Sequence, residues 1–417
     1  MNNDTASSGP ASRANATASI PSTVVPSASG RGAEAPTQGL PLSGTALDEL
    51  AERAAAAATI VGVGESTRFS RETFGVRDQL LRRLVRDHGF RALAVQDSAG
   101  AGADLDAYVS GGPGSAADAL GRAWRPQRTA EMAAALEWIR AFNQAHPHDP
   151  VRIFGVKPAQ AGREDYDTVL EHVRARAPEL LAQAASHLDP IRAAHDLDEH
   201  VQRAQGTHPG RPFAEHARDA LALVGSLPEG DGREAALDRM RLIVDFHEHS
   251  VAGRGDYAGE ATVWSDVIDG FHRRTGLRVV YWDGIAHTSA AGTVLGMAPE
   301  QDARATVGSV LRARYGDRYV SVAIGFHHGD LGVTVVPEPV AGSLDARLGE
   351  VDAAAHWLDL RRAEVRRHWD GPARARVISG VYDPHDDAAG YLAVDSLPEA
   401  FDVLVHIRRA SAVRWLS

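Results

Sequence analysis

The chain has 417 residues, of which 44% are hydrophobic, an ordinary content for a globular protein with one large core or two modest ones. Its formal net charge of −11, without a basic stripe interleaved with aromatic residues, argues against nucleic acid as a partner. The absence of cysteine excludes thiol nucleophiles, disulfides and thiolate metal sites, and Lys157, the only lysine, is the single candidate for a Schiff-base mechanism.

The first forty residues predict a disordered tail. Residues 1–40 consist mainly of Ser, Ala, Thr, Pro and Gly and contain few large apolar side chains, so burial cannot offset the entropy of ordering them. This segment lacks the apolar stretch of a secretory signal, and no run in the chain approaches the roughly 20 apolar residues of a membrane span. We therefore expect a cytoplasmic protein without a membrane partner.

The next stretch predicts a strand, a helix and a second strand, at residues 59–63, 72–88 and 92–95. Glu65 follows the first strand, and Gln96 and Asp97 follow the second. Because open α/β sheets bind ligands outside the carboxyl ends of their strands, these three side chains are the first candidates for a site. Glu65 at such a position is suited to acid–base catalysis, although it could also be a carboxylate that assists the start of the following helix.

The middle of the chain is predicted to be mostly helical. A helix at 129–145 and a buried strand at 151–156 precede a long series of helical patterns that runs from 163 to 275. Such an insertion is long for one crossover, so we expect a helical subdomain over the ligand-binding edge of the sheet. It would act as a lid on the active site, or alternatively as a structural bundle.

The C-terminal third returns to predicted strands, at 278–282, 319–325, 332–336, 376–382 and 401–407. Several of these are closely spaced and are expected to pair antiparallel at a sheet edge. Residues 41–417 are therefore predicted to form an α/β domain with a mixed, mainly parallel sheet flanked by helices. No Gly-x-Ser-x-Gly elbow, phosphate loop or dinucleotide fingerprint occurs, which disfavours a conventional serine hydrolase and a nucleotide enzyme.

Histidines supply further candidates. His287 stands just past the strand at 278–282, where it could transfer protons near neutral pH with Asp283 orienting it, or could be structural. His327 and His328 follow another strand and either line the pocket or lie in a solvent-exposed turn. Glu65, His287 and His327 have ligand types suitable for a metal. A metal at His247 to His249 is disfavoured, because adjacent helical positions do not share a face. We predict no cofactor.

Several motifs in order resemble the erythromycin esterase family over roughly residues 45–410. They are Gly64-Glu65 with the following Arg-bearing helix, Gly89 to Ala92, Trp124 with Glu131 and the 138–143 helix, Arg152 to Gly155, Glu260 with Trp264, Val280 to Trp282 leading to His287, and Val377 to Tyr382. The resemblance implies an α/β enzyme without metal, in which Glu65 and His287 belong to the active site. It also places Trp124 and Glu131 among the expected substrate-binding residues.

The chain departs from the family pattern at three positions. The resemblance implies a catalytic histidine three residues after the glutamate, where this chain has Arg68, and a glutamate after the next strand, where it has Gln96 followed by Asp97. Of the family's His-Asn-x-His motif, only the last position is retained, as His287. Arginine cannot activate water and glutamine cannot exchange a proton, so either the chemistry has been repurposed or catalysis has been lost.

A repurposed site would be cationic. Arg68, with Arg77 if it faces inward, would bind a carboxylate or stabilise an oxyanion or enolate while Glu65 or His287 moves the proton; alternatively, Arg68 simply pairs with Glu65. We predict an enzyme that tailors a small-molecule or peptide-like natural product by cyclisation, elimination or acyl transfer, as in antibiotic biosynthesis. The alternatives are an ester or macrolactone hydrolase of antibiotic resistance, with His287, His327 or His328 as its base, and a non-catalytic binding protein.

Overall fold

The structure is a computed structural model that describes residues 40–157, 161–195, 199–204, 206–208, 210–248, 257–296 and 302–416. Apart from Leu40, the predicted tail lies outside these ranges. Within them, no helix is both long enough and apolar enough to cross a bilayer.

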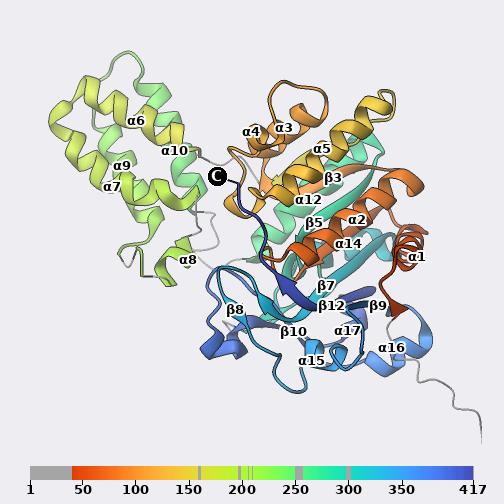
Figure 1. Cartoon of the computed structure of the whole chain (residues 1–417). Helices are drawn as coiled ribbons and strands as arrows, with labels where there is room; N and C mark the ends of the chain where they lie inside the picture. The colour runs from red at the N-terminus through yellow and green to blue at the C-terminus, as the bar shows by residue number, and fades with distance from the viewer. Residues whose placement is uncertain are drawn as a thin grey trace, which may run out of the picture. The chain divides into compact units, whose positions relative to one another are not determined.

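A nine-stranded sheet forms the centre of the α/β domain (Figure 1). In spatial order its strands are β1 (Leu40–Pro41), β9 (Ala355–Asp359), β12 (Val403–Ser411), β7 (Tyr319–Asp330), β2 (Ile60–Glu65), β5 (Arg278–Gly284), β3 (Phe90–Ser98) and β4 (Arg152–Lys157), with β8 (Val335–Val336) attached to β7. The six strands from β12 to β4 are parallel, whereas β1, β8 and β9 pair antiparallel. The predicted mixed, mainly parallel sheet is thereby confirmed.

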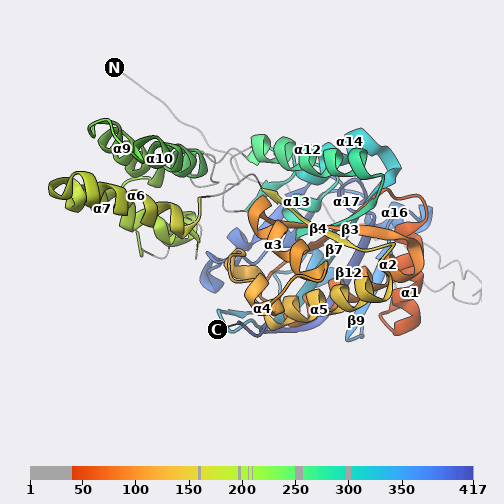
Figure 2. The ribbon, with the colours of Figure 1, turned by 90° about the horizontal axis from the view of Figure 1, so that it is seen from above.

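Helices cover both faces of the sheet (Figure 2). One face packs on α1 (Gly44–Ala55), α2 (Arg71–His88), α3 (Ala99–Val109) and α5 (Ala130–Ala145), and the other packs on α12 (Tyr257–Thr275) and α14 (Val307–Tyr315). The strands alternate accordingly: Val280 and Trp282 belong to the first core, and Val279 and Tyr281 to the second. All six residues of β2 are buried, as expected for a central parallel strand.

Local chemistry explains the boundaries of the first helix after β2. The Ser70 hydroxyl accepts a hydrogen bond from the backbone N–H of Thr73 and so caps α2, and Gly89 ends it with a φ of 70°. Gly64 in β2 has a packing role, because a Cβ there would clash with Thr288 and Ile285. The short helix α13 (Ile285–Thr288), which carries His287, therefore packs directly on β2.

Three C-terminal predictions need correction. β7 and β12 are parallel neighbours inside the sheet. The expected antiparallel pairing occurs between β7 and β8 and between β12 and β9, a strand that the pattern did not predict. Within the predicted strand at 332–336, only the two residues of β8 form a strand. Of the predicted strand at 376–382, only Arg376 is in a strand, β10 (Ala373–Arg376), which joins β11 (Tyr391–Val394) and β6 (Val294–Leu295) in a small separate sheet.

The segment predicted to be a helical insertion contains α6 (Arg163–Arg176), α7 (Leu181–Ile191), α8 (Glu199–Ala204), α9 (Phe213–Gly225) and α10 (Arg233–Glu248). Residues of α6, α7, α9 and α10 form a hydrophobic core of their own, around Tyr166, Phe213 and Met240. The last helix of the predicted insertion, α12, packs instead on the α/β domain through Trp264 and Ile268. The lid function of this segment stays a prediction.

Candidate active site

The carboxyl ends of four neighbouring parallel strands bring most of the predicted site residues together. In the order β2, β5, β3 and β4, these ends carry Glu65, Asp283, the Gln96–Asp97 pair and Lys157. Glu65 lies in register with Gly284, the residue after Asp283. Residues that are more than 200 positions apart in sequence, such as Arg68 and Asp283 with a separation of 215, become neighbours by this topology.

Glu65 forms a buried ion pair with Arg77. The Glu65 residue is 3% exposed, and its Oε2 contacts the Nη1 of Arg77, which reaches inward from α2 and is 4% exposed. The Arg77 guanidinium also lies 4.5 Å from the ring centroid of Trp282 and 4.9 Å from that of Phe74. Burial raises the pKa of Glu65, while the charges of Arg77 and Arg68 oppose this. Arg77 therefore faces inward, which is the condition under which the sequence analysis included it in a cationic site.

Arg68 has two partners in addition to the predicted ion pair with Glu65. Its Nη2 donates to Oδ1 of Asp283 at 3.0 Å and to Oε1 of Gln96, whereas its Nε lies 3.9 Å from Oε1 of Glu65. Its guanidinium lies 4.9 Å from the ring centroid of Trp124. Asp283 in turn accepts hydrogen bonds from the Tyr281 hydroxyl at 2.5 Å and from the Gly284 N–H at 2.6 Å. Asp283 thus fixes the position of Arg68 through direct contact.

His287 lies on the other side of Gln96. Its Nε2 is 3.5 Å from Nε2 of Gln96, and its ring centroid is 5.1 Å from that of Trp264. Because an arginine can only donate, Gln96 presents its oxygen to Arg68 and its NH₂ group to His287. Burial lowers the pKa of His287, with Arg68 and Lys157 acting in the same direction and Asp283 opposing them. His287 is therefore neutral near pH 7, with the lone pair of Nε2 facing Gln96.

Gln96 contacts Arg68 and His287, and Asp97 contacts the backbone of Trp124, although consecutive residues of a regular strand point to opposite faces. The register of β3 against β4 is irregular between Val95 and Ser98, as a bulge would produce. Asp97 accepts hydrogen bonds of 2.8 Å from the backbone N–H groups of Trp124 and Ser98, and burial raises its pKa to about 6. Asp97 thereby holds the loop that carries Trp124.

Lys157, which the sequence indicated only as a Schiff-base candidate, also lies at this edge of the sheet. It lies at the end of β4, with its Nζ 4.5 Å from the ring centroid of Trp124 and 5.6 Å from that of Trp264. Its position directly after the predicted strand at 151–156 was the available signal, the same one that singled out Glu65.

Three predicted residues have contacts elsewhere. Glu131, on α5, accepts hydrogen bonds of 3.1 Å from the backbone N–H and the Nε of Arg414. His327 and His328, on β7, lie with their Nδ1 atoms 2.9 Å apart, and His327 packs 6.2 Å from the ring of His406. With Glu338 they form a group of possible ligand atoms within 4.8 Å, the one such group found among the described residues, and neither Glu65 nor His287 belongs to it.

The histidine run at 246–249 is only partly described, since His249 lies outside the described residues. His247 is 1% exposed, and its Nε2 is hydrogen-bonded to the Tyr166 hydroxyl at 2.8 Å in the helical core.

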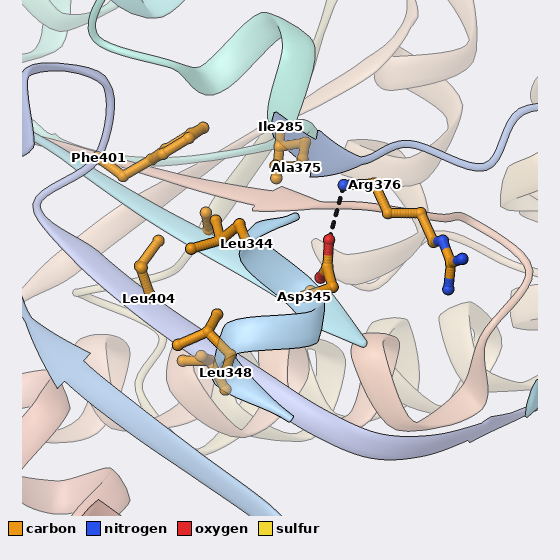
Figure 3. A pocket seen from close by; sticks show the side chains of 11 residues that line it. Ile285, Leu344, Asp345, Leu348, Ala375, Arg376, Phe401 and Leu404 are labelled. Carbon is orange, nitrogen blue, oxygen red and sulfur yellow. Dashed lines mark hydrogen bonds between the residues drawn. The ribbon is translucent and has the colours of Figure 1, made fainter. Parts of the chain in front are cut away.

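A small cavity lies apart from the predicted site residues, between β7, β12 and α15 (Leu344–Leu348) (Figure 3). Apolar side chains such as Leu344, Phe401 and Leu404 line most of it, and Asp345 points into this region while accepting a hydrogen bond from the Arg376 backbone N–H at 2.8 Å. Asp345 and Arg376 are the charged residues of its lining, and none of the predicted site residues lines it.

The fold is that of an α/β protein, and its buried, paired ionisable groups lie at the carboxyl edge of the parallel strands, where such folds bind ligands. The family model for erythromycin esterase matches residues 85–410. The chain therefore belongs to the erythromycin esterase family of esterase-like enzymes.

Solved structures share this fold at low sequence identity. A Bacillus cereus protein aligns with a TM-score of 0.63 and 19% identity, covering 92% of this chain and 97% of the other. A succinoglycan biosynthesis protein aligns with a TM-score of 0.60 and 19% identity, covering 91% and 96%. A mutant of the erythromycin esterase EreC in its open conformation aligns with a TM-score of 0.54 and 16% identity, covering 87% and 93%. A comparison with curated proteins gave no match.

Proposed function

We propose that this protein is an enzyme that tailors a natural product bearing an ester, lactone or carboxyl group, by a non-hydrolytic reaction such as cyclisation, elimination or acyl transfer. The observation that carries the proposal is the position of Arg68, which is bound to Asp283 and Gln96 where the family resemblance implies the histidine base. A guanidinium there cannot deprotonate water, but it stabilises negative charge that develops on a substrate oxygen.

In this proposal His287 moves the proton. Its pKa is lowered, so the neutral imidazole is available as a base at pH 7. Its contact with Gln96, at 3.5 Å, is long for a hydrogen bond, so a substrate group can compete for the Nε2 lone pair. Glu65 is the acid in this proposal, because burial raises its pKa. Its ion pair with Arg77 opposes protonation, so Glu65 is a weaker candidate for proton transfer than His287.

The test is mass spectrometry of macrolides, simple esters and carboxyl-bearing natural products incubated with the purified full-length chain. An isomer, or a product that has lost water or transferred an acyl group, is expected from the wild type. His287→Ala should reduce the rate by roughly 10²–10⁴-fold, the usual contribution of a general acid–base residue. The control variant is Arg86→Met. Arg86 is an exposed arginine of α2 that bonds to the backbone carbonyl of Arg82, so this variant should retain full activity.

A second candidate, hydrolysis of an ester or macrolactone, is favoured by the neutral His287 in a family of esterase-like enzymes. A product that has gained one water, formed by the wild type and lost with His287→Ala, would replace the first proposal. The double variant Arg68→His with Gln96→Glu restores the family residues and should increase hydrolysis if Arg68 suppresses it. Binding without turnover of any compound would instead support a non-catalytic protein.

A further inference from the structure

Lys157 is a cation without a direct polar partner. Its Nζ lies beside the rings of Trp124 and Trp264, and within the described part of the chain neither an ion pair nor a hydrogen bond involves its ammonium group. The neighbouring cations differ, because Arg77 is paired with Glu65 and Arg68 with Asp283. An ammonium group carries three donors, so this partly buried position has unused hydrogen-bonding capacity next to two indole rings.

The nearest negative charge does not use that capacity. Asp97 is close enough for Lys157 to lower its pKa, but the hydrogen bonds of its two oxygens come from the N–H groups of Ser98 and Trp124. The negative charge of Asp97 therefore compensates the charge of Lys157 through space, without a hydrogen bond between the two side chains. A ligand with one negative charge could therefore bind the ammonium directly without displacing any ion pair of the site.

We propose that Lys157 binds the carboxylate of the substrate, and that this substrate is an organic monocarboxylic acid whose apolar or unsaturated part lies against Trp124 and Trp264. The inference rests on the proposed function, since it names the substrate class of the same site. A carboxylate fits better than a phosphate dianion, because the two arginines are already paired and one ammonium neutralises one charge. The two indole rings supply apolar contact area next to the cation.

Binding at Lys157 would also affect the base. The charge of Lys157 contributes to the lowered pKa of His287, so a carboxylate that neutralises this charge makes His287 more basic. The substrate would thereby strengthen the base that acts on it.

The experiment uses the fact that Lys157 is the only lysine. Reductive methylation of the full-length chain with isotope-labelled formaldehyde keeps the positive charge and yields one side-chain NMR signal, with the N-terminal amine as an internal control. Acetate, phenylacetate and octanoate are titrated beside their neutral amides. We expect phenylacetate or octanoate to shift the Lys157 signal saturably, the matching amides to leave it in place, and the N-terminal signal to be unaffected.

Substitutions of Lys157 test whether its positive charge or its nucleophilic amine is responsible for binding. Lys157→Met should weaken carboxylate binding, followed by tryptophan fluorescence of the unmethylated chain, by roughly tenfold or more, whereas Lys157→Arg should retain it within a few-fold. Arg86→Met should bind like the wild type. Equal shifts with acids and amides, unchanged affinity in Lys157→Met, or a borohydride-trapped adduct of pyruvate on Lys157 would each overturn the inference.

Failure of the carboxylate-binding inference can be distinguished from failure of the proposed function, because binding is measured without turnover. Carboxylate binding that depends on Lys157 in a chain that converts nothing would contradict the catalytic proposal alone. Turnover that depends on His287 but has the same KM for carboxylates in Lys157→Met would contradict the carboxylate site alone.

Discussion

Two regions of this molecule bury ionisable groups in opposite ways. At the carboxyl edge of β2, β5 and β3, Glu65 and Asp283 are in direct contact with arginines. Between β7, β12 and β9, His327, His356 and His406 lie near one another, and the rings of His356 and His406 are 5.4 Å apart. Neither nitrogen of His356 nor the Nε2 of His406 has a hydrogen-bond partner within the described chain.

The difference shows two solutions to the cost of burying a titratable group. The first region compensates full charges with opposite charges, so its stability depends on both partners being present. The second avoids charge: burial lowers the pKa of His356 to about 4 and that of His406 well below its usual value. Arginines suit a site that needs permanent charge, whereas the histidine cluster remains neutral and contributes packing.

The largest effect is expected from removing one partner of the buried pair. Arg77→Met would leave Glu65, which is 3% exposed, without its closest counter-charge, and should lower the free energy of unfolding by about 3–5 kcal/mol. Urea denaturation at pH 7 measures this free energy of unfolding. The double variant Arg77→Met with Glu65→Gln should recover part of the loss, and Arg86→Met should change stability by less than about 0.5 kcal/mol. A loss no larger in Arg77→Met than in Arg86→Met would show that the pair contributes nothing.

The histidine cluster should make the folded protein less stable as pH falls. The folded pKa of His356, about 4, lies below its usual value of 6.5, so between these values the unfolded state binds more protons and stability decreases as pH falls. From pH 7 to pH 5 this residue should cost about 2 kcal/mol.

The measurement must isolate His356, because burial raises the pKa of Asp345 to about 6 and the carboxyl group has the opposite pH dependence. Urea denaturation of wild type and His356→Phe at pH 5, 6 and 7 does so: the stability difference between them should move in favour of the variant as pH falls. His385→Asn, which removes an exposed histidine, should track the wild type. A pH-independent difference for His356→Phe would contradict the neutral-cluster interpretation.

A smaller effect is expected at the hydrogen bond that supports Asp283. Tyr281→Phe removes the 2.5 Å donor to Oδ2 and leaves the ring, so unfolding free energy should fall by about 1.5 kcal/mol, the value of a hydrogen bond to a charged group. If Asp283 positions Arg68 as proposed, turnover should also fall. Tyr315→Phe, which removes the hydroxyl bound to Asp269 at 2.7 Å outside the site, controls for the loss of a tyrosine–aspartate bond and should affect turnover little.

Much of the site was predictable because strand-end position is a local signal. The apolar runs placed Glu65, Gln96 and Asp97 after buried strands, and the parallel sheet brings these strand ends to one edge. The partners of Arg68 were predicted only in part: it lies 3.9 Å from Glu65, three residues earlier, but it also contacts Asp283, 215 residues away. Strand β9 was missed, and the parallel pairing of β7 with β12 was not predicted, because local sequence does not determine which strands become neighbours.

The sequence by itself determined the type of most elements and the absence of thiol chemistry, since hydrophobic periodicity and residue identity need no partner. It also determined that arginine stands where the family resemblance implies a base. Only the tertiary structure decided which arginine pairs with which carboxylate, that the register of β3 is irregular at Gln96 and Asp97, and that Lys157 lies near two tryptophans. These features depend on contacts between distant segments and on shared desolvation, which exist only after the strands have assembled.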